Sequence, residues 1–360
     1  MNRKFQGATF NNKYYTTEAL IAYSEKELAS GLLPEWELKI YRFLLTFFDD
    51  KEYVEQLSSG TTGTPKNFKL SKSAMIQSAQ NTIEILGLKP KDNALLCLPI
   101  DYIAGKMMVV RALLAGFNLN WEEPSSAPLL QNYDTIDFCA MVPMQVYNSI
   151  ENREVFKSIG TLIIGGSELR SDVKELIGGL SNTIYETYGM AETCSHIALR
   201  KISGQNRDES FKILPGISIS VDDRNCLKIS ASYLENEVVT NDVVELIDET
   251  RFLWKGRYDN LINSGGIKIN PEQLEASISK IIGMECAVIG VADKKLGQKV
   301  VLFVESVQKL DTNDLALLIK DKLTGFHVPR KIVVVKQLPR NKSFKTDRLK
   351  LKELIDRKDI

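Results

Sequence analysis

The chain has 360 residues, 46 Lys and Arg against 46 Asp and Glu, and 44% hydrophobic residues. This length suffices for two or more domains, and the composition is typical of a globular protein. The neutral charge balance argues against nucleic acid or an acidic membrane surface as the main partner. No apolar run approaches the roughly twenty residues that span a bilayer, so we expect no membrane span.

The cysteine content indicates a reducing compartment. The cysteines are odd in number and scattered, which predicts free thiols rather than a disulfide framework: Cys97, Cys139, Cys194, Cys226 and Cys286. The first residues lack the apolar core of a signal peptide, so we expect a cytoplasmic protein. With two histidines and no Cys/His cluster, the sequence argues against a structural zinc site.

The first chemical signal in chain order is a loop at 58–66, which reads Ser-Ser-Gly-Thr-Thr-Gly-Thr-Pro-Lys. Its glycines let the backbone approach a phosphate closely, and successive N–H groups in such a loop form an anion-binding concavity. Because Pro65 precedes the lysine, the loop does not match a Walker A motif. We expect it to bind phosphate through Ser59, Gly60, Thr61, Thr62, Gly63, Thr64 and Lys66.

Beyond the loop, short apolar runs alternate with helical patterns. The expected strands are 94–98, 138–142, 162–164 and 183–188, and the expected helices are 107–115 and 171–177. This alternation predicts an α/β fold with a mostly parallel, doubly wound sheet. Ligands bind beyond the carboxyl ends of such strands. The pairs Gly165-Gly166 and Tyr188-Gly189 lie at two of these ends.

The remainder of the chain changes character twice. Residues 213–254 read as short strands separated by polar turns, which predicts a small antiparallel or barrel-like subdomain. A compact α+β unit is expected after Asp259. Its helices are predicted at 272–281, 311–323 and 346–357, and its strands at 286–291, 299–305 and 331–336.

Six motifs follow one another in a familiar order. After the loop come Tyr-Gly-Met-Ala-Glu-Thr (188–193), Thr-Asn-Asp (240–242), Gly-Arg-Tyr-Asp (256–259), Ser-Gly-Gly-Ile-Lys-Ile-Asn-Pro-Glu (264–272) and Pro-Arg-Asn-Lys-Ser-Phe-Lys-Thr-Asp-Arg (339–348). Through these motifs and their order, the chain resembles the adenylate-forming superfamily, which includes acyl-CoA synthetases. The resemblance implies an N-terminal adenylate-binding domain at 1–258 and a small mobile C-terminal lid domain at 259–360. It also implies a hinge at Asp259. Only 57 residues precede the loop, so we expect an N-terminal part that is shorter than is usual in the superfamily.

The resemblance also implies roles for single residues in binding ATP and Mg²⁺. The loop would hold the β- and γ-phosphates, Tyr188 would stack on adenine, and Glu192 would bind Mg²⁺, since a carboxylate suits a hard cation. Asp242 would accept hydrogen bonds from the ribose, and Arg257 would reach the ribose or a phosphate. Ala191 replaces a threonine that is usual in the family, which leaves Thr193 or the loop to contact the α-phosphate. From the residues alone, a surface glutamate and arginine, a turn aspartate and a core tyrosine are the structural alternatives.

For the chemical step, the resemblance implies that Lys345 bridges the acyl carboxylate and the α-phosphate. Its register supports this role, because it lies six residues after Pro339 and three before Arg348, although Phe344 replaces a glycine usual in the family. Gly265 and Gly266 would line a tunnel for the thiol of coenzyme A; a plain turn is the alternative.

The acyl pocket is marked by the run from Pro99 to Gly105, where Tyr102 replaces a histidine usual in the family. Lys106, Arg111 and His196 are candidates for binding a second carboxylate of the substrate, although a cation at such a position is more often an ordinary surface or helix residue.

Within the superfamily the chain most resembles the o-succinylbenzoate–CoA ligases of menaquinone biosynthesis, through its short length and residues 102–111, 188–200 and 263–272. This resemblance implies an ATP-dependent ligase that joins a small-molecule carboxylate to coenzyme A. The alternatives are another aryl- or acyl-CoA ligase, an enzyme that uses a carrier protein as acceptor, and a non-catalytic adenylate-binding relic.

Overall fold

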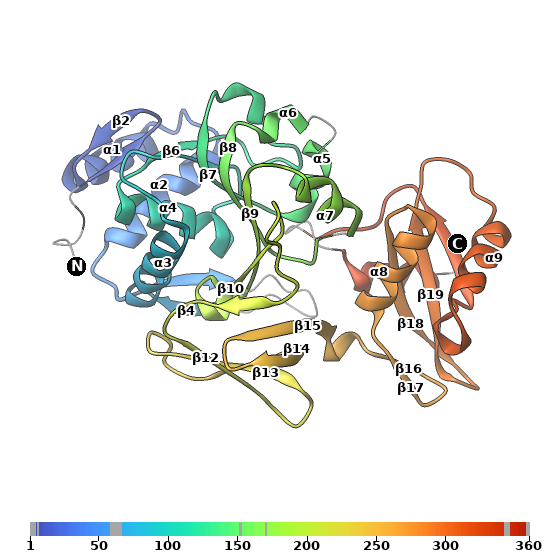
Figure 1. The fold of residues 1–360 in the computed structure, drawn as a ribbon. Helices are drawn as coiled ribbons and strands as arrows, with labels where there is room; N and C mark the ends of the chain where they lie inside the picture. Colours follow the sequence, from blue (N-terminus) through green and yellow to red (C-terminus); the bar gives the residue numbers. More distant parts are fainter. Residues whose placement is uncertain are drawn as a thin grey trace. The chain divides into compact units, whose positions relative to one another are not determined.

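The computed structural model describes residues 5, 7–57, 67–150, 153–169, 171–341 and 346–357 (Figure 1). The chain forms two compact units. The first consists mainly of the residues up to Leu169 together with Val173–Ser218 and Ser230–Val238, and the second mainly of Ile219–Ile229 and the residues from Val239 onward. Within the described ranges, none of the helices combines the length and the apolar character that crossing a membrane requires.

The first unit is built on parallel strands in the order β9-β8-β7-β5-β6-β1. Their bounds are β1 (Ala8–Phe10), β5 (Asn93–Leu96), β6 (Asn118–Trp121), β7 (Ile136–Met141), β8 (Ile159–Ile164) and β9 (Thr183–Gly189). Antiparallel strands continue it, with β2 (Lys13–Tyr15) beside β1, and β10 (His196–Lys201) followed by β11 (Phe211–Ile213) beside β9. The strand order reverses between β5 and β7, which is where open α/β sheets bind ligands.

Helices cover both faces of this sheet. Alternate side chains of β5 belong to different cores, because Leu96 shares a core with Met75 of α3 whereas Leu95 shares one with Val146 of α5 and Ile177 of α7. The first face carries α1 (Thr17–Ser30), α2 (Glu35–Phe48), α3 (Lys72–Leu86) and α4 (Ile103–Ala115), and the second carries α5 (Pro143–Ser149), α6 (Arg153–Phe156) and α7 (Ser171–Gly178). The predicted doubly wound α/β class is therefore confirmed.

An antiparallel hairpin flanks the phosphate-loop sequence. Strands β3 (Tyr53–Leu57) and β4 (Asn67–Ser71) pair from Tyr53 opposite Ser71 to Leu57 opposite Asn67. The phosphate-binding residues expected at 59–66 lie outside the described residues. No helices or strands were predicted for the first 57 residues. In the structure this part of the chain forms β1, β2, α1, α2 and β3.

The second unit contains two groups of hydrogen-bonded strands. The first has neighbouring strands β12 (Ile217–Val221), β13 (Cys226–Ala231), β14 (Val238–Asp248) and β15 (Arg251–Arg257), and β14 and β15 are antiparallel. The second has the order β17 (Ile267–Ile269), β16 (Ile262–Ser264), β19 (Gly297–Glu305) and β18 (Cys286–Asp293), with β20 (Lys331–Val335) parallel to β19. Helices α8 (Pro271–Ile282) and α9 (Thr312–Lys322) pack on one face of it, and α10 (Arg348–Asp356) on the other.

The helices and strands expected from residue 92 onward are present, with ends that shift by a few residues. The largest shift is in α4, which begins at Ile103; the preceding residue, Tyr102, is extended and makes no side-chain capping hydrogen bond. The domain boundary at 258/259 and the hinge at Asp259 stay predictions.

Candidate active site

The ends of β8 and β9 place the predicted glycines as expected. Gly165 and Gly166 directly follow β8, and Tyr188 and Gly189 end β9. Tyr188 is buried, and its ring packs against Phe211 with 5.8 Å between centroids. A Cβ at Gly189 would lie 2.3 Å from the Ser195 carbonyl oxygen, so glycine is required for the close approach of β9 to the start of β10. The role of these residues in nucleotide binding stays a prediction.

A short 3-10 helix, η3 (Ala191–Thr193), follows β9. The Thr193 hydroxyl donates to the carbonyl oxygen of Ser195 at 2.7 Å and accepts from the Met190 N–H at 3.1 Å, so it holds this turn together. Glu192, in contrast, is exposed. Among the described residues, no group of three or more His, Cys, Asp or Glu could hold a metal ion. A lone carboxylate still fits Mg²⁺ that arrives with a nucleotide, since proteins bind it through one or two carboxylates plus substrate phosphates.

A buried cation lies just beyond this turn. Arg111 of α4 is 2% exposed, and its Nη2 donates to Ser195 Oγ at 2.9 Å. Ser195 Oγ lies 3.4 Å from Nδ1 of His196, whose Nε2 lies 3.2 Å from Thr82 Oγ1. In the described part of the chain, no carboxylate pairs with Arg111, and its Nε has no hydrogen-bond partner. The arrangement therefore offers an uncompensated positive charge inside the protein.

Burial sets the charge state of this cluster. It lowers the pKa of Arg111 to about 9, which leaves the guanidinium charged at neutral pH. Burial, and then the charge of Arg111, lower the pKa of His196 well below its usual range, so the imidazole is neutral. Arg111 is thus the cation of the pair, and a ligand carboxylate would supply the counter-ion that burial of a charge requires.

The third cationic candidate lies elsewhere. Lys106, also on α4, donates to the Glu55 carbonyl oxygen at 3.1 Å and to Gln56 Oε1 at 2.9 Å. The structure therefore joins Arg111 and His196 through Ser195 and leaves Lys106 with separate partners on β3. Tyr102 is half-buried at the start of α4.

A buried carboxylate that the sequence analysis did not single out joins the strand ends. Glu186 of β9 is 2% exposed, and it accepts a hydrogen bond from the Leu169 N–H at 3.1 Å. Arg200 donates to it at 2.6 Å and Lys174 lies 3.2 Å away. Glu186 therefore fixes the loop after β8 against β9. Its signal in the sequence was a glutamate inside an expected strand, on the same face as Ile184 and Tyr188.

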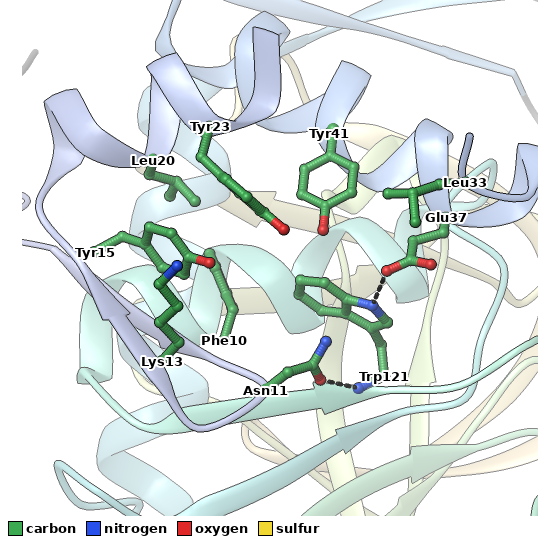
Figure 2. A pocket seen from close by; sticks show the side chains of 10 residues that line it. All are labelled: Phe10, Asn11, Lys13, Tyr15, Leu20, Tyr23, Leu33, Glu37, Tyr41 and Trp121. Atoms are coloured by element: carbon green, nitrogen blue, oxygen red, sulfur yellow. Dashed lines mark hydrogen bonds between the residues drawn. The ribbon is translucent and has the colours of Figure 1, made fainter. Parts of the chain in front are cut away.

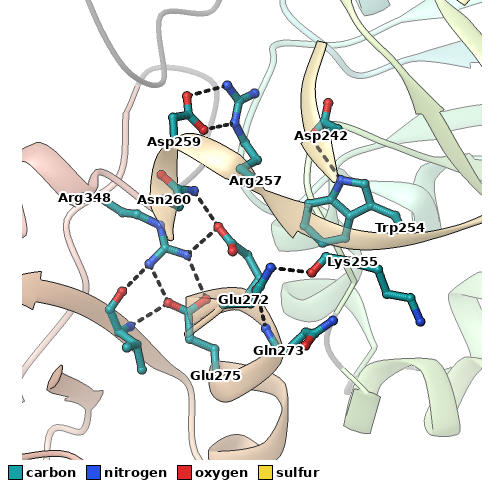
Figure 3. A network of polar contacts seen from close by, with 12 residues as sticks. Asp242, Trp254, Lys255, Arg257, Asp259, Asn260, Glu272, Gln273, Glu275 and Arg348 are labelled. Carbon is teal, nitrogen blue, oxygen red and sulfur yellow. Dashed lines mark hydrogen bonds and ion pairs between the residues drawn. The ribbon is translucent and has the colours of Figure 1, made fainter. Parts of the chain in front are cut away.

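In the second unit, the two predicted ribose-binding residues face each other across β14 and β15 (Figure 3). Asp242 is 7% exposed and accepts a hydrogen bond from Trp254 Nε1 at 3.0 Å. Arg257 donates to both carboxylate oxygens of Asp259, at 2.9 and 2.7 Å. Burial acts to raise the pKa of Asp259, but the contacts with Arg257 outweigh it. The pKa therefore lies below its usual value, and the carboxylate stays ionised.

The motif at 264–272 forms a hairpin and a helix start. Gly265 and Gly266, with φ of +60° and +82°, connect β16 to β17, where Ser264 pairs with Ile267. The turn thus requires glycine for conformational reasons, and the proposed thiol tunnel stays a prediction. Asn270 caps α8 by accepting from the Gln273 N–H, which explains the asparagine of this motif.

Arg348 joins two of the motifs, 264–272 and 339–348, in a partly buried network that also includes Asn260 (Figure 3). It donates to Glu275 at 2.6 and 2.9 Å and to Glu272 at 3.3 Å. Glu272 in turn accepts from Asn260 Nδ2 at 2.5 Å. Arg348 starts α10, three residues after Lys345, which lies outside the described residues. From the sequence, Arg348 served only to set the register of Lys345, and Glu275, one helical turn beyond Glu272, was not expected in a site.

Comparison with known proteins identifies the family. The family model described as AMP-binding enzyme matches residues 49–230, and that of the AMP-binding enzyme C-terminal domain matches 283–345. The chain belongs to the AMP-binding enzyme family. This confirms the resemblance derived from the six motifs.

Individual relatives of this AMP-binding enzyme are similar over most of their length. The 2-succinylbenzoate–CoA ligase of Listeria monocytogenes is 28% identical over 96% of this chain and 77% of its own. The Escherichia coli protein of the same name is 26% identical over 84% and 68%. A solved acyl-CoA synthetase (AMP-forming)/AMP-acid ligase II-like protein from Dyadobacter fermentans is 33% identical over 91% and 97%, with a TM-score of 0.59.

One further solved structure concerns the fold alone. The O-succinylbenzoate coenzyme A synthetase of Bacillus subtilis, in complex with ATP and a magnesium ion, is 18% identical to this AMP-binding enzyme. The superposition of the two structures covers 97% of each chain and gives a TM-score of 0.79.

Proposed function

We propose that this chain is an AMP-forming ligase that activates o-succinylbenzoate and transfers the acyl group to coenzyme A, as in menaquinone biosynthesis. The observation that carries the choice of substrate is the buried, uncompensated guanidinium of Arg111 beside the Tyr188–Thr193 motif. A substrate with a second carboxylate would neutralise it, whereas a fatty acid would leave it unpaired. The names of the Listeria and Escherichia relatives support the same substrate.

In this proposal the carboxylate of the substrate attacks the α-phosphate of ATP, pyrophosphate leaves, and the thiol of coenzyme A then displaces AMP. Lys345 stabilises the charge that develops in the first step, and a single preorganised donor of this kind is worth on the order of 10²–10³ in rate. Residues 59–66 hold the departing phosphates, and Glu192 holds Mg²⁺. Asp242 and Arg257 hold the ribose.

Arg111 holds the carboxylate that is not activated, through the Nε of its guanidinium, which has no hydrogen-bond partner among the described residues. His196, neutral in its buried position, serves as a hydrogen-bonding partner of Ser195 rather than as a second cation. Glu186 keeps the loop at Gly165 in register with Tyr188, so that both contact the adenine.

We also propose a cytoplasmic location, which the free thiols of the described cysteines support.

A substrate comparison tests the proposal. The purified chain receives ATP, Mg²⁺ and coenzyme A with o-succinylbenzoate, 4-oxo-4-phenylbutanoate, benzoate or a medium-chain fatty acid at equal concentration, and acyl-CoA is measured. We expect o-succinylbenzoate to give the highest kcat/KM. The matched control is 4-oxo-4-phenylbutanoate, which lacks only the carboxylate on the ring. Equal turnover of these two compounds would contradict the role of Arg111, and preference for the fatty acid would contradict the substrate.

A further inference from the structure

A hollow lined by aromatic rings lies at the edge of the first unit's sheet (Figure 2). It has a volume of about 270 Å³ and is bounded by β1, β2, α1, α2 and β6. Five rings follow one another around it, with centroids 5.0 to 6.0 Å apart, in the order Tyr15, Tyr23, Tyr41, Trp121 and Phe10. We call this group of rings the aromatic cage. None of these residues has a role in the proposed ligase reaction.

Two charged side chains face the aromatic cage. Glu37 accepts a hydrogen bond from Trp121 Nε1 at 2.9 Å, which fixes a carboxylate at one end. At the other end, Nζ of Lys13 lies 5.1 Å from the ring centre of Tyr15 and 5.5 Å from that of Tyr23. Lys13 itself is exposed, so its side chain can leave for solvent without unpacking a core. The chain thus already places one cation of its own against these rings.

The electrostatic character of the aromatic cage favours positive charge. The face of an aromatic ring carries negative charge density and attracts ammonium groups, most strongly where they are desolvated. Burial raises the pKa of Tyr23 to about 12, so this ring stays a neutral phenol at physiological pH. An anion would meet the carboxylate of Glu37, and a volume near 270 Å³ suits a small ligand rather than a nucleotide.

We propose that the aromatic cage is a binding site for a small organic cation of the alkylammonium class, which takes the place of the Lys13 ammonium. The ring faces of Tyr15, Tyr23 and Tyr41 surround the cation, and Glu37 supplies the counter-charge. The residues of the aromatic cage are separate from those assigned to ATP and the acyl substrate, so this proposal does not depend on the proposed function.

Calorimetric titration of the full chain with choline tests this site. The matched control ligand is 3,3-dimethylbutan-1-ol, which has the shape of choline without its charge, and sodium chloride at equal concentration controls for ionic strength. We expect saturable binding of choline and at least tenfold weaker binding of the neutral alcohol. Equal binding of both ligands would overturn the proposal, because the hollow would then recognise shape and apolar surface rather than charge.

Two variants make the test independent of the wild-type affinity. Lys13→Met removes the competing ammonium, and we expect choline to bind roughly three- to tenfold more tightly. Glu37→Gln keeps an acceptor for Trp121 Nε1 while removing the charge, and choline should bind more weakly. Lys309→Met, at an exposed position in the second unit, should change nothing. If choline bound neither to the wild type nor to Lys13→Met, the aromatic cage would only pack against the Lys13 side chain, and the proposal would be overturned.

Discussion

Arg111→Met should make the protein more stable and a poorer enzyme. Arg111 is a buried charge without a carboxylate partner in the described structure. Methionine has a similar length and fills the same space without charge. Replacing buried ionic groups by apolar ones of similar volume is often neutral or stabilising, by about 1–4 kcal/mol. A residue whose presence costs stability is retained for function, which is the reasoning that this variant tests.

The magnitude follows from the pKa of Arg111, which burial lowers from 12.5 to about 9. At about 1.4 kcal/mol per pKa unit, burying the charge costs on the order of 5 kcal/mol. The hydrogen bond from the guanidinium to Ser195 returns roughly 1.5–3 kcal/mol. Arg111→Met should therefore stabilise the first unit by about 2–3.5 kcal/mol, or roughly 4–14 °C in Tm for a domain of this size.

The sign of the pH dependence follows from the same shift. The folded-state pKa of Arg111 lies below that of the unfolded chain, so the unfolded state binds more protons between the two values. The destabilisation by Arg111 is therefore complete below about pH 9 and decreases as the pH rises above it. The difference in stability between Arg111→Met and wild type should shrink over that range.

The assay is thermal unfolding of both proteins together with kinetics on two substrates. Arg111→Met should raise KM for o-succinylbenzoate about 10- to 100-fold, as expected for loss of a charge-assisted hydrogen bond, and leave KM for 4-oxo-4-phenylbutanoate nearly unchanged. Lys106→Met is the control on the same helix, since it removes a lysine with two acceptors and should not stabilise. A fall in Tm for Arg111→Met, or an equal rise in KM for both substrates, would refute the reasoning.

Four further changes probe the remaining assignments. Lys345→Ala should abolish carboxylate-driven pyrophosphate exchange but largely spare thioester formation from a supplied acyl-adenylate; equal loss in both half-reactions would refute its role. Asp259→Pro should do the reverse, because proline fixes φ at a hinge, and normal rates in both steps would exclude the hinge. Glu192→Gln should raise the Mg²⁺ concentration needed for half-maximal adenylation, and an unchanged metal titration would return Glu192 to the surface-residue alternative. Arg348→Met should destabilise the second unit by about 1.5–3 kcal/mol, because the partly buried Glu275 loses two charge-assisted hydrogen bonds. Burial already raises the pKa of Glu275, and a carboxyl with a raised folded-state pKa lowers stability at pH values above its unfolded-state pKa. The loss of stability measured by urea unfolding should therefore become smaller at acid pH. A loss that does not depend on pH would contradict this.

The sequence alone determined the family and the fold class. The six motifs are short, local and ordered along the chain, so their identity requires no knowledge of distant contacts. The alternation of apolar strands and amphipathic helices likewise predicts a doubly wound sheet, because each signal lies within one element. For the same reason, Gly165, Gly166 and Tyr188 were correctly expected at strand ends.

The tertiary structure decided which polar residues share a site. Lys106, Arg111 and His196 were equivalent candidates in the sequence. Only the folded structure joined Arg111 to His196 through Ser195 and gave Lys106 its separate partners on β3. The network of Arg348 with Glu275 and the aromatic cage were not visible in the sequence at all. Each consists of residues far apart along the chain, and their burial, which sets their charge state and their need for partners, exists only once the chain is folded.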